Sequence, residues 1–404
     1  MLRGESLSMP DLTEVKMRIA RGEDFHTEFK EQQTNPDSMA RTIVSFANSD
    51  GGWILIGVAD DGTVKGVSNV DQVCQWVDNI ALNNCEPPIV VRSISVEFED
   101  GKAVVLVEVP RGEMRPYKTR QGVPWVRTSS GTRPASNEEL RRMLQSSGYL
   151  YYDETLVYRS GLSDLDSGAI DELIKSALDL GIEIGDMPQD RLLMNWRLLG
   201  ESERGKQLTV AGALFLARRP QEHVPYAYVS ALRIPGTEIS NVPQDQKRIE
   251  GRVRQILEDT LRFLQIHLRC PHQLVAMEPE AEPEIPLVVL RELLVNAVAH
   301  RDYTISGPIR VIVFDDRVEI WTPGLLPNTV TIESLRTGIH VLRNPTIYNI
   351  LLKLRLVTDA GSGIPRVIRL MREKLGLEPQ FSVENQQFVV RLPRPSIGQH
   401  RREI

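Results

Sequence analysis

The sequence has few cysteines, no long apolar run and no excess of positive charge. Its three cysteines, Cys74, Cys85 and Cys270, are spaced neither as a disulfide framework nor as a metal site, which favours a reducing compartment. The longest apolar segment, Leu208 to Ala217, is shorter than the ~18 residues that a membrane span requires. The first residues have no apolar signal core. We therefore expect a cytoplasmic protein that does not cross a membrane.

The charge balance limits how the chain could bind nucleic acid. The formal net charge is −6 over 404 residues, whereas a protein that binds nucleic acid through its overall field is basic. Any binding of a polyanion must therefore come from a local patch. The hydrophobic content of 41% and charged content of 25% are ordinary globular values, and the length predicts two or three domains.

The stretch from Leu290 to Tyr303 has the pattern of a helix with a polar line. Glu292, Asn296 and His300 lie four residues apart, so they share one side of the helix. An amide oxygen can ligate a hard cation, and a carboxylate beside it can orient a water molecule. A solvated helix face fits the same spacing. The apolar residues also recur at helical spacing: Leu290, Leu293, Leu294 and Ala297.

This stretch resembles the N-box of the GHKL (Bergerat-fold) ATP-binding proteins, which include gyrase, MutL and histidine kinases. The resemblance implies ATP and Mg²⁺ as cofactors, with Glu292 as general base, Asn296 as the metal ligand and His300 lining the site. The longer pattern Glu-x-x-x-Asn-Ala-x-x-His-Arg-Asp-Tyr resembles more narrowly the C-terminal module of bacterial "divergent AAA" or Schlafen/AlbA-type transcriptional regulators. That likeness extends from about Leu208 to Leu392.

Three glycines complete the implied cofactor site. Gly361 and Gly363 precede an expected helix, where backbone N–H groups can approach phosphates closely, although an ordinary glycine-rich helix entry fits as well. Gly324 lies in the stretch that matches the adenine-binding motif of GHKL proteins. Those proteins place an aspartate there against the adenine amino group, whereas this chain has Thr322 and no acid. The resemblance therefore leaves adenine recognition open.

The N-terminal part has a second set of motifs. Glu23…Glu28-Phe-Lys30, Phe46-Ala-Asn-Ser-Asp-Gly-Gly52 and a strand ending near Asp60 resemble the Schlafen/AlbA-like domain over roughly residues 15–145. Many bacterial members are described as DNA-binding, and some eukaryotic members are metal-dependent ribonucleases whose acids match Glu23, Glu28 and Asp60. Three such carboxylates beside Lys30 would hold divalent cations at a phosphodiester. A surface edge of ion pairs fits the same residues.

One strip, residues 111–133, is locally basic. Six cations face a single acid, Glu113, with Tyr117 and Trp125 interleaved, so phosphates and bases could both find partners. A solvated strand and loop with two core aromatics is the alternative. The candidate nucleic-acid contacts in this strip are Arg111, Arg115, Lys118, Arg120, Arg127 and Arg133, to which we add Lys30.

Two segments complete the organisation of the chain. Gln246 to Leu268 has the periodicity of one long amphipathic helix. Gly200 to Lys206 fits the first seven positions of a P-loop, but Gln207 replaces the Ser or Thr that ligates magnesium, so we expect a loop.

We expect an α/β (α+β) fold of two modules. Residues 1–147 would form a Schlafen/AlbA-like domain, 148–205 a helical connector, 206–395 a GHKL-like (Bergerat-like) domain, and 396–404 a basic tail. The first hypothesis is a nucleic-acid-binding transcriptional regulator, for DNA rather than RNA, that responds to a nucleotide and forms a homodimer. A metal-dependent nuclease that uses Glu23, Glu28 and Asp60 is the alternative, and a scaffold that binds neither ligand is the third.

Overall fold

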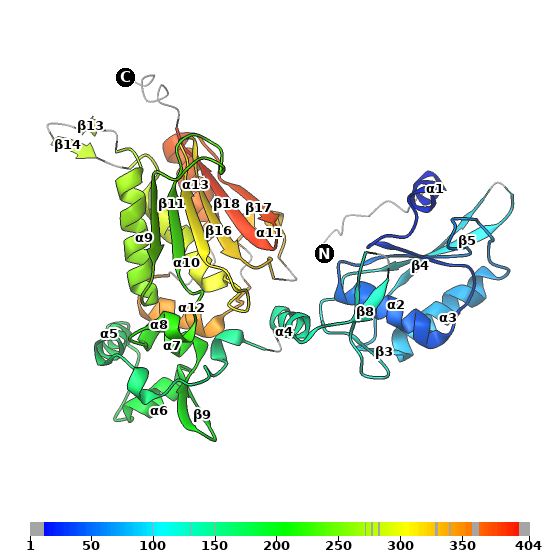
Figure 1. Ribbon diagram of the computed structural model, residues 1–404, viewed down its shortest axis with the longest axis horizontal. Helices are drawn as coiled ribbons and strands as arrows, with labels where there is room; N and C mark the ends of the chain where they lie inside the picture. The colour runs from blue at the N-terminus through cyan, green and yellow to red at the C-terminus, as the bar shows by residue number, and fades with distance from the viewer. Residues whose placement is uncertain are drawn as a thin grey trace. The chain divides into compact units, whose positions relative to one another are not determined.

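The computed structural model shows two compact units, residues 1–150 and residues 151–404 (Figure 1). Each unit combines helices with a mixed β-sheet, which confirms the expected α+β two-domain fold. Within the described ranges, every helix falls short of the length and apolar character needed to span a bilayer. The residues that the structure describes are 12–98, 100–129, 131–148, 150–270, 272–275, 278–281, 283–327, 330–338, 341–357 and 363–395.

The first unit is built on a four-stranded sheet with helices on both faces. The strand order is β1-β2-β5-β4, with β1 and β2 parallel and the other pairs antiparallel. Ile54 and Ile56 of β2 face α2 and α3, whereas Leu55 between them faces α1, because successive strand residues point to opposite faces. The elements are α1 (Leu12–Arg21), β1 (Thr27–Lys30), α2 (Pro36–Asn48), β2 (Gly52–Ile56), α3 (Val70–Asn83), β4 (Arg92–Glu97) and β5 (Ala103–Val109).

Short-range signals in the sequence define several helix starts. The Asn35 side chain accepts a hydrogen bond from the Asp37 N–H, and Pro36 opens α2. Ser136 and Glu139 form both bonds of a capping box at the start of α4. The remaining elements of this unit are β3 (Cys85–Glu86), β6 (Lys118–Thr119), β7 (Trp125–Arg127), β8 (Thr132–Pro134) and α4 (Asn137–Ser146).

The second unit contains a six-stranded sheet in the order β12-β11-β15-β16-β18-β17. Only β11 and β15 pair in parallel among these neighbours. The helices α9, α10 and α13 pack against one face of this sheet (Figure 1). These elements are β11 (Val229–Arg233), β12 (Asp245–Ile249), α9 (Val253–His267), α10 (Leu287–His300), β15 (Ile309–Val313), β16 (Arg317–Pro323), α13 (Gly363–Leu375), β17 (Gln380–Glu384) and β18 (Gln387–Pro393).

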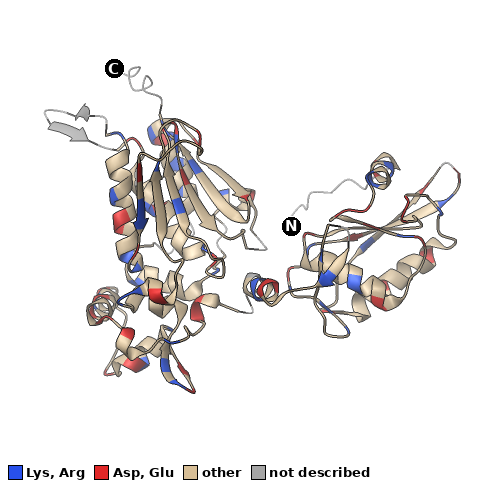
Figure 2. Cartoon of the chain, in the orientation of Figure 1, with Lys and Arg blue, Asp and Glu red and all other residues tan. Residues whose placement is uncertain are grey.

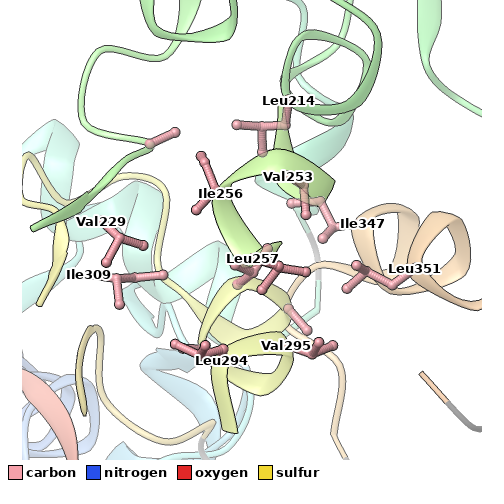
Figure 3. Packing of buried hydrophobic residues seen from close by; sticks show 14 of the residues in the cluster. Leu214, Val229, Val253, Ile256, Leu257, Leu294, Val295, Ile309, Ile347 and Leu351 are labelled. Carbon is pink, nitrogen blue, oxygen red and sulfur yellow. The ribbon is translucent and has the colours of Figure 1, made fainter. Parts of the chain in front are cut away.

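The core of the second unit surrounds α10. Leu294 and Val295 of α10 lie among aliphatic side chains from α9 and from the neighbouring strands and helices (Figure 3). Burying each such side chain contributes about 1.5–3 kcal/mol to folding. The helix is therefore apolar on most of its circumference, and its polar residues need a separate explanation. The labelled partners are Leu214, Val229, Val253, Ile256, Leu257, Ile309, Ile347 and Leu351.

Residues 151–205, which the sequence predicts as part of a connector, pack into the second unit. Leu173, Leu193 and Leu198 belong to its main hydrophobic core. The segment is therefore a structural part of that unit. Its elements and the remaining ones of the unit are η1 (Tyr152–Glu154), η2 (Leu162–Asp164), α5 (Ser167–Leu178), α6 (Gln189–Asn195), β9 (Leu199–Ser202), β10 (Gly205–Leu208), α7 (Val210–Leu216), α8 (Pro220–His223), β13 (His272–Val275), β14 (Glu278–Ala281), α11 (Ile332–Arg336) and α12 (Pro345–Lys353).

Two local predictions are wrong. Residues 245–249 form strand β12 against β11, and the helix predicted from Gln246 begins only at Val253. Gly251 separates the two elements with a φ of 120°, a value that an α-helix does not allow. The P-loop-like stretch from Gly200 to Lys206, predicted as a loop, lies in the β9–β10 hairpin, where Lys206 pairs with Asp190.

A buried carboxylate ties η1 to α12. Asp153 is fully buried, and its Oδ2 accepts a hydrogen bond of 3.0 Å from the Ile347 N–H. Burial raises the pKa of Asp153 to about 6, from an ordinary value of 3.8. Between pH 3.8 and about pH 6, Asp153 therefore keeps a proton in the folded state that it releases in the unfolded state. The contribution of Asp153 to stability is therefore greatest in acid and falls as the pH rises toward 6.

Asp153→Asn is expected to remove this pH dependence. The free energy of unfolding of the wild type, relative to the variant, should fall by up to about 3 kcal/mol between pH 4 and pH 7. Urea denaturation of both proteins at a series of pH values measures the difference. Parallel pH profiles would contradict the assignment.

Candidate functional site

A cavity in the second unit brings together residues from α10, β16 and α13. Glu292, Asn296 and His300 of α10 line it, together with Gly324 and Gly363. The space open to water inside it is about 110 Å³, enough for several water molecules. Much of the remaining lining is apolar and includes Leu293, Ile320, Leu335, Val341, Ile364, Phe388 and Val390. Glu292 and four of the predicted cofactor-binding residues, Asn296, His300, Gly324 and Gly363, thus line one cavity.

The polar line of α10 faces the cavity, together with Leu293 and Ala297 beside it. From Glu292 to His300, only Glu292, Asn296 and His300 are half-buried, and the other six residues are buried. Among the residues that the structure describes, neither the Glu292 carboxylate nor the Asn296 amide has a hydrogen-bond or ion-pair partner. Both groups are therefore available to a cation or a polar ligand in the cavity.

Gly363 allows α13 to begin directly against this pair. A Cβ added at Gly363 would lie 2.3 Å from Glu292 Oε1 and 3.3 Å from Asn296 Nδ2. A larger residue at 363 would therefore push the end of the Glu292 side chain away, whereas glycine leaves the carboxylate beside the start of α13. The first turn of a helix has free N–H groups and a partial positive charge, which favour an anion such as phosphate. Gly361, the other predicted phosphate-binding glycine, lies outside the described residues.

Strand β16 contributes a threonine and no acid to the described cavity lining. Thr322 of β16 lines the cavity and is 6% exposed, and Glu292 is the one carboxylate among the described lining residues. Gly324 has a φ of 118°, and an added Cβ would lie 2.3 Å from Arg343 Nη1 and 2.8 Å from Asp302 Cβ. Both its backbone conformation and its packing therefore require glycine.

The Gly324 contacts belong to a buried polar cluster that the sequence does not predict. Asp302 forms an ion pair with Arg343 at 3.3 Å, and both side chains are more than 90% buried. Arg343 also donates a hydrogen bond to the Leu325 carbonyl, in the cavity wall. The ion pair therefore fixes residues 324 and 325 against the end of α10.

Arg301 and Asn344 complete this cluster. Arg301 is 2% exposed, and its Nη2 donates to the carbonyl oxygens of Tyr226, Ile305 and Gly307. Asn344 Nδ2 donates to the carbonyls of Ala299 and Arg301, at 2.9 and 2.8 Å. Burial lowers the pKa of the Arg301 guanidinium. In the sequence, the residues of this cluster lie in two motifs, Arg301-Asp-Tyr and Arg343-Asn-Pro. Their buried polar side chains support the fold.

In the first unit, the three predicted nuclease carboxylates are not brought together as metal ligands. Glu28 is paired with Lys30 and Arg127, both at 2.6 Å, and Glu23 Oε1 accepts a hydrogen bond from the Phe29 N–H. Asp60 lies exposed in a turn. In the described part of the chain, no group of three or more His, Cys, Asp or Glu side chains is arranged to hold a metal ion.

The Glu28–Arg127 pair is buried and well connected. The Arg127 side chain is 0% exposed, donates to the Phe25 and Asp24 carbonyls, and lies 4.4 Å from the centre of the Phe46 ring. Burial by itself raises the pKa of Glu28, but the hydrogen bonds and charges of Lys30 and Arg127 outweigh it and lower the pKa below its ordinary value. These residues therefore stabilise the fold.

The six cations between residues 111 and 133 do not form one basic surface. Arg115 and Arg127 are buried, and burial lowers the pKa of Arg115 to about 10. Arg111 pairs with Asp50 at 3.3 Å and Arg133 with Glu139 at 2.7 Å. Basic and acidic residues are interspersed over this unit (Figure 2). The exposed cations of the strip without an ion pair to any described residue are Lys118 and Arg120.

The motif from Phe46 to Gly52 also has a structural role. The Asn48 side chain bonds the Tyr117 N–H and carbonyl, at 2.7 and 2.8 Å, and the Trp125 carbonyl at 2.9 Å. A Cβ added at Gly51 would lie 2.8 Å from the Arg111 backbone nitrogen. The motif therefore joins α2 to the strands that carry the basic strip.

Two protein families match parts of the chain. Residues 23–136 match the family described as "Schlafen, AlbA_2", and residues 306–392 match the one described as "Putative ATP-dependent DNA helicase recG C-terminal". The chain therefore carries a Schlafen/AlbA_2 domain and a recG-like C-terminal domain. The second match includes β15, β16, β18 and α13 but begins after α10, so it does not cover Glu292, Asn296 or His300.

Solved structures give distant similarities. The DIP2311 protein from Corynebacterium diphtheriae is 19% identical, with a TM-score of 0.49 over 95% of this chain and 80% of that one. The N-terminal domain of a "Putative ATP-dependent DNA Helicase RecG-related Protein" from Nitrosomonas europaea is 20% identical, with a TM-score of 0.25 over 32% of this chain and 92% of that one. No curated protein matches the chain.

Arg127→Met is expected to destabilise the first unit, and Arg133→Met in the same strip is not. Removing Arg127 leaves Glu28 with one partner in a largely buried site, which costs about 3 kcal/mol or more. Arg133 is 48% exposed, so its loss should cost less than about 1 kcal/mol. Chemical denaturation measures both, and equal stabilities of the two variants would show that Arg127 is not a structural residue.

Proposed function

We propose that this protein is a nucleic-acid-binding regulator whose second unit binds a nucleoside triphosphate together with Mg²⁺. One observation carries the proposal: the first residue of α13 lies against Glu292 and Asn296, and all three line a largely apolar cavity. A helix start suits phosphates, oxygen ligands suit Mg²⁺, and apolar walls suit a base.

Each residue has a role in this proposal. Asn296 would supply its amide oxygen to the metal ion, and Glu292 would hold a water molecule next to the phosphates. The Gly363 backbone would approach the phosphates, while His300 and Thr322 would lie along the rest of the ligand. The oxygen ligands present fit a hard cation, and Mg²⁺ would neutralise phosphate charge there. The family resemblance includes the same glutamate and asparagine, which supports these assignments.

The first unit supplies the nucleic-acid-binding part of the proposal. Its support is the Schlafen/AlbA_2 match over residues 23–136, and the recG-like match in the second unit favours DNA over RNA. Regulation of transcription and a homodimer follow from the resemblance to the bacterial regulators. A metal-dependent nuclease receives no comparable support, because Glu28 is engaged by Lys30 and Arg127.

Titration calorimetry of the full chain with ATP and Mg²⁺ tests the nucleotide site. Binding heat is expected for the wild type and should be lost or much reduced in Asn296→Ala and Gly363→Ala. An alanine at 363 needs only the flexible end of Glu292 to move, so that variant should fold while it displaces the carboxylate. Gly161→Ala is the matched control, since an added Cβ there meets no atom within 4 Å. The proposal fails if the wild type gives no heat, or if both glycine variants bind equally.

Discrimination between adenine and guanine is expected to be weak. The Thr322 hydroxyl in the cavity wall can donate or accept a hydrogen bond, so it suits either purine. A site built around a fixed partner rejects the wrong base strongly. ATP and GTP should therefore bind within about tenfold of each other. Competition between the two nucleotides measures the ratio, and a preference above about a thousandfold would contradict this assignment.

A further inference from the structure

A cationic groove lies between α11 and α13 on the second unit. It has a volume of about 400 Å³ and is lined by Arg336, Pro365, Ile368, Arg369, Arg372 and Glu373. The groove lining therefore has three arginines, one glutamate and an apolar floor that Pro365 and Ile368 form. Arg366, exposed on the same helix, precedes Arg369 by three residues and lies on a neighbouring part of the helix surface.

The arginines of the groove are accessible. The side chains of Arg336 and Arg372 are 43% and 64% exposed and share Glu378 as a salt-bridge partner. Arg369 is exposed and has no ion pair with any residue that the structure describes. Since the whole chain carries a net charge of −6, this is a local concentration of positive charge on an acidic protein.

We propose that this groove binds single-stranded nucleic acid. Guanidinium groups bind phosphate oxygens in a forked geometry, and the exposed arginines of α13 form a row that can follow a phosphate backbone. Pro365 and Ile368 give the floor an apolar surface for a sugar or base, which an acidic peptide would not require. The second unit therefore contacts nucleic acid at a surface separate from the Schlafen/AlbA_2 domain.

The groove and the cavity are lined by neighbouring residues of the same two helices. On α13, Ile364 lines the cavity and Pro365 lines the groove; on α11, Leu335 lines the cavity and Arg336 lines the groove. A ligand in the cavity and a ligand in the groove would therefore both contact α11 and α13, which form the wall between them. If one ligand shifts this wall, each ligand must change the affinity of the other by the same factor. This coupling, unlike the groove itself, rests on the proposed nucleotide site.

Fluorescence anisotropy with a labelled 20-nucleotide DNA strand tests the groove in the full chain. Arg369→Glu should bind about five- to tenfold more weakly at 50 mM salt, and its slope of log K against log salt should be shallower by about 0.7 for each phosphate that the variant no longer binds. The matched control is Arg262→Glu on α9, whose side chain is 68% exposed and does not line the groove. Control and wild type should bind equally.

The outcomes are distinct. Equal binding by Arg369→Glu and the control overturns the proposal, as does displacement of the strand by polyglutamate as effectively as by unlabelled DNA. Arg369→Gln removes the positive charge without reversing it. It is used in place of Arg369→Glu if Arg369→Glu unfolds at a lower temperature than the wild type. Both variants should keep the calorimetric heat of ATP and Mg²⁺. Failure of the wild type to bind nucleotide would refute the nucleotide site and leave the DNA measurement decisive for the groove.

Discussion

The absence of a side chain at Gly363 is the constraint on which the rest of this site depends. It lets the first turn of α13 lie against Glu292 and Asn296, so that a positive helix end meets a carboxylate and an amide at the edge of the cavity. With a bulkier residue there, the carboxylate would have to move, and the space beside the helix start would be smaller. The Glu292 carboxylate, the Asn296 amide and the start of α13 lie close together for this reason.

The cavity wall at Gly324 and Leu325 depends on buried charge. The Asp302–Arg343 pair, through the Arg343 hydrogen bond to the Leu325 carbonyl, holds the chain around Gly324 and Leu325 against the end of α10. Breaking such a pair exposes an uncompensated charge to a low-dielectric interior, which is far more costly than losing a surface salt bridge. The stretch from Glu292 to Tyr303 therefore divides by role: one side of the helix up to His300 lines the cavity, and Arg301 and Asp302 belong to the buried polar cluster that follows it.

The sequence predicted the local features well because they depend on neighbouring residues. The fourfold spacing of Glu292, Asn296 and His300 sets one side of a helix, and Asn35-Pro36 or the Ser136 capping box mark helix starts through short-range bonds. Features that depend on distant partners were not predictable. The composition of residues 111–133 gave no indication that Arg127 turns inward to reach Glu28, or that residues 245–249 pair with β11. The groove between α11 and α13 likewise requires two helices far apart in sequence.

A crystal structure of the full chain with Mg²⁺ and a non-hydrolysable ATP analogue tests the central claim most directly. The account predicts that the metal ion is bound by Asn296 Oδ1, that the phosphates lie at the first turn of α13, and that the base lies toward Thr322. A nucleotide bound elsewhere, or a metal ion held without Asn296, would contradict it.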